Sequence, residues 1–207
     1  MTIIVRQYWP FYVKNTAPQR FDYTDPTNSM PPITSVFSWD KGSDSLLLTD
    51  FDAHLNFKDQ WFLRVDNKGQ VVEWLDKYPN NKSVNMEKPF GAPIEWGSVQ
   101  NVGDTLVTYP KMNPLKSWPP AFSSGVQIVV FEDVLDTLTM PNGTVYKDVL
   151  QFTYLQSWGS GYGTGARYWM PNNVGPVQLQ WLAQDPSDPT RRKMIETNKM
   201  YATVTSM

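Results

Sequence analysis

The chain contains no cysteine and only one histidine among its 207 residues. Without cysteine, disulfides, thiol catalysis and thiolate metal sites are excluded. A single imidazole also excludes any mechanism that needs two histidines, and it leaves a serine–histidine–aspartate triad with little support. Oxidising and reducing compartments both remain open, because a domain of this length can fold without disulfides.

Charged residues are also scarce, at 18% of the chain, and the formal net charge is -2. Positive and negative side chains are interspersed, so no basic face or stripe indicates a nucleic-acid partner. No apolar run reaches the roughly eighteen residues of a membrane span, and the apolar stretch at the amino terminus is too short for a signal peptide. The sequence therefore predicts neither nucleic-acid binding nor a transmembrane segment.

Aromatic residues and proline are abundant instead, with nine Trp, ten Tyr, ten Phe and seventeen Pro. Aromatic residues favour strands, whereas proline is confined to strand edges and loops. One domain spanning residues 1–207 fits this length. We therefore expect an all-β fold, either an antiparallel meander or a sandwich- or barrel-like sheet, with long Pro/Trp-rich loops and little helix.

Two successive hairpins are predicted in residues 139–181. Asn142-Gly143 is a common hairpin turn because both residues tolerate positive φ angles. Residues 126–140 and 144–157 alternate aliphatic and polar positions on either side of it, and they are expected to form the backbone of the main sheet. Pro171 opens a second turn. Its flanking strands are expected at residues 165–170 and 175–181.

Shorter strands are expected along the rest of the chain. A further hairpin is predicted around Asp66-Asn67-Lys68-Gly69, between residues 60–65 and 70–75. The proline-rich segment 76–124 is interpreted as wrapping loops, apart from one short strand within it. The other strand candidates are residues 44–49, 53–57 and 105–109, and residues 191–206 fit either a strand or a short helix.

Two separated segments carry a family resemblance. Near the amino terminus stands Tyr8-Trp9-Pro10-Phe11, followed by Val13-Lys14-Asn15 and then Phe21-Asp22-Tyr23; residues 166–170 (ARYWM) lead to residues 173–177 (NVGPV). These segments resemble the "YFPL…GN…W-Y" opening and the "YYAKGVGLVK" hairpin of a broad group of exported bacterial β-sheet proteins, many of them lipoproteins of unknown function. Two positions depart from the pattern of that group: Lys14 stands where the group usually has Gly, and Pro176 stands where it often has Leu.

The resemblance implies an antiparallel sheet in an extracytoplasmic location, periplasmic or secreted. It implies no catalytic residue, because the group shares no catalytic motif. The aromatic pair Tyr168-Trp169 would cover both faces of a strand, and Gly175 would permit a turn. This interpretation of Tyr168, Trp169 and Gly175 depends only on strand and turn geometry, and it does not require the family resemblance.

Asp50, Asp52 and His54 form the candidate metal site. In an extended strand alternate residues project to one face, so these three side chains would lie together. Two carboxylates and an imidazole can hold a divalent cation, or an acid can orient His54 as a general base. The same spacing also fits a solvent-facing polar row on a half-exposed strand, with Phe51 and Leu55 buried, and we prefer that interpretation.

Aromatic side chains near predicted loops and strand ends are the candidate ligand-binding residues. A flat indole face can stack on a sugar ring, while neighbouring polar side chains supply directional hydrogen bonds. Tryptophan can also plug the end of a sheet, so at least half of these rings are expected in the core. The candidates are Trp39, Trp61, Trp74, Trp96, Trp118, Trp158 and Tyr162.

Two further sequence patterns bear on a hydrolytic site and on a phosphate-binding loop. Acidic residues interleave with Trp74 and Trp96, and paired carboxylates beside aromatic rings are typical of glycosidases. The glycine-rich stretch 159–165 lacks the Lys-Ser/Thr of a phosphate-binding loop and fits a hairpin connection. The acids are Glu73, Asp76, Glu87 and Glu95.

These patterns favour a non-catalytic protein that binds carbohydrate or another extracellular polymer through exposed tryptophans. No cofactor is predicted. The first alternative is a structural or assembly component, such as a surface, capsid or tail protein that forms homo-oligomers, because exposed strand edges favour strand addition. The second is a β-sheet glycoside hydrolase or polysaccharide lyase that uses paired carboxylates.

Overall fold

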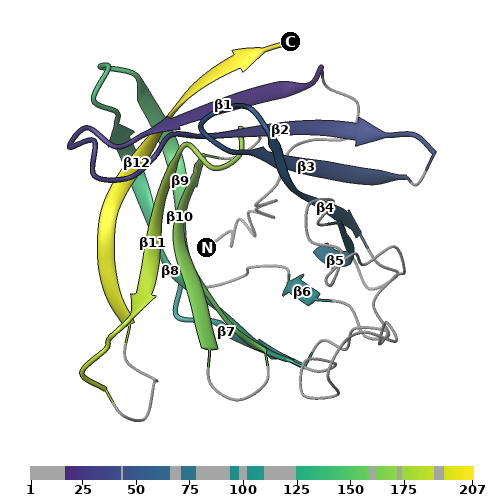
Figure 1. Cartoon of the computed structure of the whole chain (residues 1–207), viewed down its shortest axis with the longest axis vertical. Coiled ribbons are helices and arrows are strands. Elements are labelled where there is room, and N and C mark those ends of the chain that lie inside the picture. The colour runs from purple at the N-terminus through teal and green to yellow at the C-terminus, as the bar shows by residue number, and fades with distance from the viewer. Residues whose placement is uncertain are drawn as a thin grey trace, which may run out of the picture.

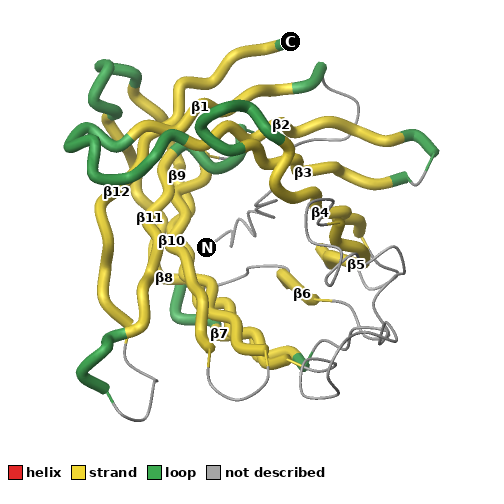
Figure 2. The backbone as a smooth tube through the Cα atoms, in the orientation of Figure 1, coloured by secondary structure: helices red, strands yellow, loops and turns green. Residues whose placement is uncertain are grey.

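The computed structural model describes residues 17–42, 44–65, 71–77, 94–97, 102–109, 125–158, 162–171, 174–188 and 194–207. Within these residues the chain forms twelve strands and no helix (Figure 2), which confirms the predicted all-β class. The strands are β1 (Gln19–Thr24), β2 (Ile33–Asp40), β3 (Ser45–Phe51), β4 (Phe57–Val65), β5 (Val71–Lys77), β6 (Ile94–Gly97), β7 (Thr105–Thr108), β8 (Gly125–Thr139), β9 (Val145–Trp158), β10 (Tyr162–Pro171), β11 (Gln178–Gln184) and β12 (Met194–Ser206).

All twelve strands belong to one antiparallel sheet made of two meanders. β1 to β6 are neighbours in space as in sequence, as are β7 to β12, and pairing of β1 with β12 joins the halves. Figure 1 shows the sheet curling round so that its two halves face each other. Its two edge strands, β6 and β7, are not paired with each other, so the sheet is not closed into a barrel. None of the described residues belongs to a helix that could cross a membrane.

The core lies on the concave face of this curled sheet. Phe21 and Phe37 from one half belong to the same buried cluster as Phe131 and Phe152 from the other half. The strands between them contribute Met200, Leu179 and Ala166 to the same cluster, so the core runs continuously along this face of the sheet. Because side chains alternate along a strand, the residues between these core positions lie on the convex face.

The hairpin of β8 and β9 confirms the strands predicted at residues 126–140 and 144–157. Its turn differs from the expected one, since of Asn142 and Gly143 only Gly143 has a positive φ, at 86°. The Gly143 N–H donates to Met140 O at 2.9 Å, and the Thr144 N–H donates to Asn142 Oδ1 at 3.0 Å. This is the three-residue hairpin loop in which glycine takes the left-handed position.

The other hairpin predictions are confirmed in outline. β4 and β5 pair as predicted for residues 60–65 and 70–75, although their turn lies outside the described residues. β10 and β11 also pair, but β11 begins later than expected, at Gln178. Gly175 belongs to the connection instead, with a φ of 106°.

Three strand assignments differ from, or refine, the sequence prediction. The strand predicted at residues 53–57 is wrong, because β3 ends at Phe51 and the chain turns through Leu55, whose φ is 59°. β6 lies inside the proline-rich segment that was interpreted as loops. Residues 191–206 contain the strand β12, and β7 confirms the strand predicted at residues 105–109.

We expect Gly175→Ala to destabilise the protein more than Gly143→Ala. Both glycines have a positive φ, so both substitutions carry the same kind of backbone strain. A methyl group at position 175 would lie 3.1 Å from Phe21 Cζ, whereas nothing lies within 4 Å of one at position 143. Because Phe21 is fully buried, overpacking should add about 1 kcal/mol to the strain. Urea unfolding measures the difference, and equal losses would contradict the role of Phe21.

Candidate functional site

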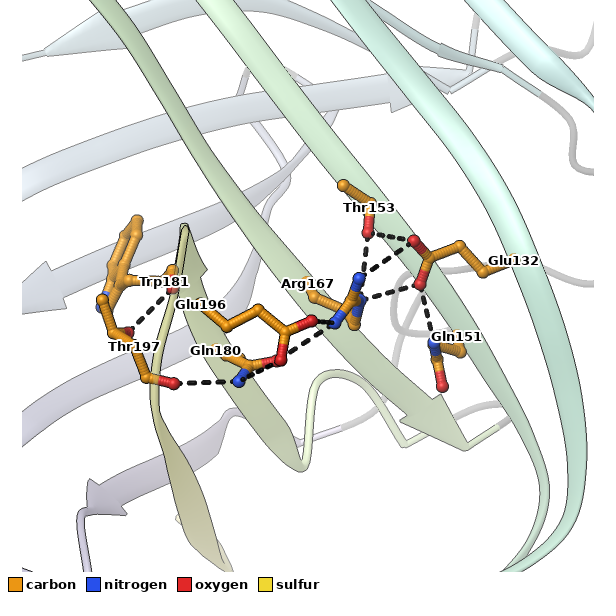
Figure 3. Close-up of polar contacts among 8 residues, drawn as sticks. All are labelled: Glu132, Gln151, Thr153, Arg167, Gln180, Trp181, Glu196 and Thr197. Carbon is orange, nitrogen blue, oxygen red and sulfur yellow. Dashed lines mark hydrogen bonds and ion pairs between the residues drawn. The ribbon is translucent and has the colours of Figure 1, made fainter. Parts of the chain in front are cut away.

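A group of polar side chains crosses five strands on the convex face (Figure 3). Arg167 on β10 lies at its centre, between Glu132 on β8 and Glu196 on β12. Arg167 Nε donates to Glu132 Oε2 at 2.8 Å, and Arg167 Nη1 donates to Glu196 Oε1 at 2.5 Å. We call these three residues the Arg167 cluster; the amide and hydroxyl groups around it belong to Gln151, Thr153 and Gln180.

Two β-bulges help to bring the glutamates to the central arginine. On β8 the register shifts between Phe131 and Asp133, so Glu132 is an extra residue. On β12 the register shifts between Lys199 and Glu196. A bulge re-aims a side chain and increases the local twist. This matters because each glutamate lies two strands from β10, a separation of about 10 Å that the long side chains must cross.

Both glutamates of the Arg167 cluster are held as carboxylates. Burial raises the pKa of Glu132, but hydrogen bonds from Gln151, Thr153 and Arg167 outweigh it and hold that pKa below its ordinary value. The hydrogen bond and the charge of Arg167 lower the pKa of Glu196. The general acid of a glycosidase needs a raised pKa to keep its proton at neutral pH. The cluster therefore fits a structural clamp better than a hydrolytic carboxylate pair.

We expect the free energy of unfolding to fall as the pH is lowered from 7 to 3. The folded-state pKa values of Glu132 and Glu196 are lowered. The stabilisation is therefore complete above the unfolded-state pKa of about 4.3, and it is lost as the pH falls through the folded-state value. Urea unfolding at a series of pH values should show a shallower loss in Glu132→Gln. Asp136→Asn, which removes an exposed carboxylate from the same strand, is the control, and an equal effect there would contradict the assignment.

A second polar group lies on the concave face, among the core residues. Asp50 on β3 alternates with the core residues Leu46 and Leu48, and the sheet register pairs it with Ser35 on β2. Ser35 Oγ donates a 2.5 Å hydrogen bond to Asp50 Oδ1. Asp50 is half-buried. A carboxylate on a core face is costly to desolvate, so its position calls for hydrogen-bond partners.

The charge of this carboxylate affects the pKa of a buried tyrosine. Tyr23 on β1 is only 2% exposed, and its hydroxyl donates a 2.5 Å hydrogen bond to the Pro176 carbonyl. Burial raises the pKa of Tyr23 well above its ordinary value, and the charges of Asp50 and Tyr168 raise that pKa further. Tyr168 lies on β10, in the other half of the sheet. We call Asp50, Ser35, Tyr23 and Tyr168 the Asp50 cluster: Ser35 is hydrogen-bonded to Asp50, and the two tyrosines are linked to the group through the electrostatic effects on the pKa of Tyr23.

Comparison of the chain with protein-family models, with curated proteins and with solved structures found no match. Function is therefore inferred from the two faces of the sheet. The expected kinship with exported bacterial β-sheet proteins stays a prediction, and so does the extracytoplasmic location that it implies.

Trp39 and Trp61 are the predicted ligand-binding residues whose side chains the structure describes. Both are half-buried on the concave face and pack against the core. They lie on either side of β3, because the register pairs Trp39 with Leu46 and Trp61 with Leu48. Each ring therefore fills part of the core and keeps part of its surface accessible.

The remaining aromatic candidates can be placed only by their backbone. Trp158 and Tyr162 are direct cross-strand partners on β9 and β10. Trp74 on β5 and Trp96 on β6 each lie at a register shift. The side chains of these four residues lie outside the described part of the structure, as does the whole of Trp118.

The predicted alignment of Asp50, Asp52 and His54 on one strand is wrong. β3 ends at Phe51, and Asp52 begins a turn in which its Oδ1 accepts the N–H groups of His54 and Asn56, each at 2.9 Å. Hydrogen bonds from Asn56 lower the pKa of Asp52. Within the described residues no group of three or more His, Cys, Asp or Glu side chains is placed to hold a metal ion. Alternate side chains project to the same face only as long as the chain stays extended, and here the strand ends before Asp52.

The predicted acidic pairs near Trp74 and Trp96 have no described side chains. The register of β5 and β6 pairs Glu95 with Val72, and Glu73 with Ile94, so the two glutamates are not cross-strand partners. Asp76 lies in β5, and Glu87 lies outside the described residues. A hydrolytic pair among these acids stays a prediction.

The sequence patterns did not indicate the Arg167 cluster or the partners of Asp50. Glu132 and Glu196 are 35 and 29 positions from Arg167. A local signal did exist, because Arg167 stands between the core residues Ala166 and Tyr168 and must therefore lie on the opposite face. Its partners could be named only after the strand order was known.

Proposed function

We propose that this protein is a non-catalytic binding protein for carbohydrate or another extracellular polymer and that the concave face takes the ligand. The Asp50 cluster, set among half-buried aromatic rings, is the observation that carries this proposal. Sugar recognition combines apolar ring faces with a few directional hydrogen bonds. Trp39 and Trp61 supply such ring faces, and the carboxylate of Asp50 is an acceptor for ligand hydroxyl groups.

The position of Asp50 supports binding over a purely structural role. Leu46 and Leu48 occupy the preceding concave-face positions of β3 and are 4% and 6% exposed, so this row of the strand is otherwise built for the core. An apolar residue at position 50 would avoid the cost of desolvating a charge. We infer that the half-buried carboxylate of Asp50 is kept for hydrogen bonding to a polyhydroxylated ligand on the concave face.

We expect Asp50→Asn to weaken ligand binding at least tenfold, about 1.4 kcal/mol, because the amide replaces one acceptor oxygen with a donor. Asp22→Asn is the matched control. Asp22 accepts a 2.6 Å hydrogen bond from Thr34 of β2, as Asp50 does from Ser35, but on the convex face. A glycan array on the purified protein would identify the ligand, and titration of tryptophan fluorescence would then give the affinity.

Two outcomes would contradict the proposal. The first is an array on which no glycan binds and a fluorescence signal that no polysaccharide changes. The second is an equal loss of affinity in Asp22→Asn and Asp50→Asn, which would place the binding site away from the concave face. Circular dichroism of both variants would show whether the sheet is retained.

A structural or assembly component is the second candidate function, because apolar side chains are exposed beside the edge strand β7. Val102, Val107 and Tyr109 are 55%, 45% and 69% exposed. Exposed apolar side chains at a strand edge favour pairing with another chain. Light scattering over a concentration series discriminates: a mass that rises with concentration, together with an empty glycan array, favours assembly, whereas a monomer at every concentration opposes it.

A further inference from the structure

The two edges of the sheet form a seam between β6 and β7. Each edge strand has four residues, and the two are consecutive in the sequence. Their Cα atoms come within 8 Å of each other, yet no described pairing joins the two strands. Paired strands are separated by about 4.8 Å, so the edges are close to the separation at which they would pair. Figure 1 labels both strands in the lower half of the molecule.

The strand count makes β6 and β7 suitable partners. Twelve strands in a row have eleven neighbouring pairs, and every one of these pairs is antiparallel. An odd number of reversals leaves the first and last strands antiparallel to each other. β6 and β7 can therefore pair directly as a hairpin, whereas one inserted strand would have to run parallel to one of them.

Pairing at the seam would be reversible. Edge strands carry main-chain N–H and C=O groups that can bond either to water or to another strand. Exchanging bonds to water for bonds between two short strands yields little net free energy. Open and closed forms of such an element can both be populated, and a small bias shifts their ratio.

We propose that β6 and β7 act as a gate, which closes the sheet into a ring of twelve strands when they pair and admits molecules to the concave face when they separate. The simplest register pairs the described residues of the two strands directly. It places Gly97 opposite Thr105 and Glu95 opposite Val107. Leu106 then keeps its place on the concave side, where it packs against the core.

The absence of cysteine allows a direct test by disulfide formation. A disulfide requires Cα atoms within about 7 Å of each other, so Glu95→Cys combined with Val107→Cys reports closure of the seam. The positive control is Val72→Cys with Glu95→Cys, whose positions are register partners in β5 and β6. We expect mild oxidation to give an intramolecular disulfide in both variants, at rates within tenfold of each other, as judged by mass and by non-reducing gels.

Two outcomes would overturn the proposal. Free thiols in the seam variant while the control pair oxidises, or disulfides only between molecules, would overturn the gate. Hydrogen exchange of the unmodified protein gives a second measurement that needs no substitution. Closure predicts slow exchange for all the amides of β7, at least tenfold slower than in an open edge. Protection of only the alternate amides that bond to β8 would overturn the proposal as well.

Discussion

Replacing Gly165 with alanine is expected to lower the free energy of unfolding by about 3 kcal/mol. A methyl group at this position of β10 would lie 2.7 Å from Leu155 Cδ2 and 2.8 Å from the Tyr154 carbonyl oxygen. Side-chain atoms can rotate away from such a contact, but a main-chain oxygen cannot. Relief would require β9 and β10 to separate where Gly165 pairs with Leu155.

Urea unfolding of Gly165→Ala and Gly42→Ala measures this effect against a matched control. A methyl group at Gly42 would come no closer than 3.5 Å, to Asp40 Oδ1, and Gly42 is exposed. We expect that substitution to change stability by less than about 0.5 kcal/mol. Adding Leu155→Ala to Gly165→Ala should restore only part of the loss, because the contact with the Tyr154 carbonyl persists. Complete restoration would contradict the main-chain explanation.

Replacing Arg167 with methionine is expected to lower the free energy of unfolding by about 2 kcal/mol. The side chains of Arg167 and Glu132 are only 20% and 24% exposed. Without the guanidinium group, Glu132 keeps a desolvated charge with no cation beside it. Arg167→Lys should recover less than half of the loss, because a single ammonium group cannot reach both glutamates with the geometry of a guanidinium fork.

A double-mutant cycle identifies which glutamate matters. Arg167→Met combined with Glu132→Gln should be more stable than Arg167→Met alone, since the uncompensated charge is gone. Glu196 is 58% exposed, so Glu196→Gln should cost no more than about 0.5 kcal/mol. Equal costs for Glu132→Gln and Glu196→Gln would contradict a clamp that depends on burial.

The Arg167 cluster and the Asp50 cluster lie on opposite faces of the sheet. We expect the first to stabilise the fold and the second to bind the ligand. On the convex face, one cation joins carboxylates on β8 and β12. We expect this bridge to stabilise β9 and β10, the strands that carry Phe152 and Tyr168, whose rings are 5.4 Å apart on the concave face. Loss of the bridge should therefore weaken ligand binding indirectly, whereas Asp50→Asn should weaken it with little change in stability.

Several elements followed directly from local patterns. The alternation of residues 126–140 and 144–157 predicted β8 and β9, and Gly143 was expected at a position that needs a positive φ. The prediction at residues 53–57 was wrong, because Leu55 adopts a left-handed conformation that leucine seldom takes. β6 was missed because proline suppresses strand predictions around it, although Ile94–Gly97 itself contains none.

The candidate site was predictable only in part. Asp50 was predicted to align with Asp52 and His54, but these two residues belong to a turn that leaves the strand. Asp50 accepts a hydrogen bond from Ser35 of another strand, β2. Trp39 and Trp61 were expected to contribute ring faces, and their half-buried positions keep both the core and the ligand roles open to test.

The sequence by itself determined the all-β class, the long hairpin and the exclusion of thiol chemistry, because these depend on residue types and on patterns within a few positions. Only the tertiary structure decided which residues meet. Pairing of β1 with β12 joins the two meanders into one sheet. The Tyr23 hydroxyl donates to the Pro176 carbonyl across 153 positions, and the order of β8 to β12 aligns Arg167 with two distant glutamates. Side-chain alternation is local, whereas strand order and curvature arise from contacts between segments far apart in the chain.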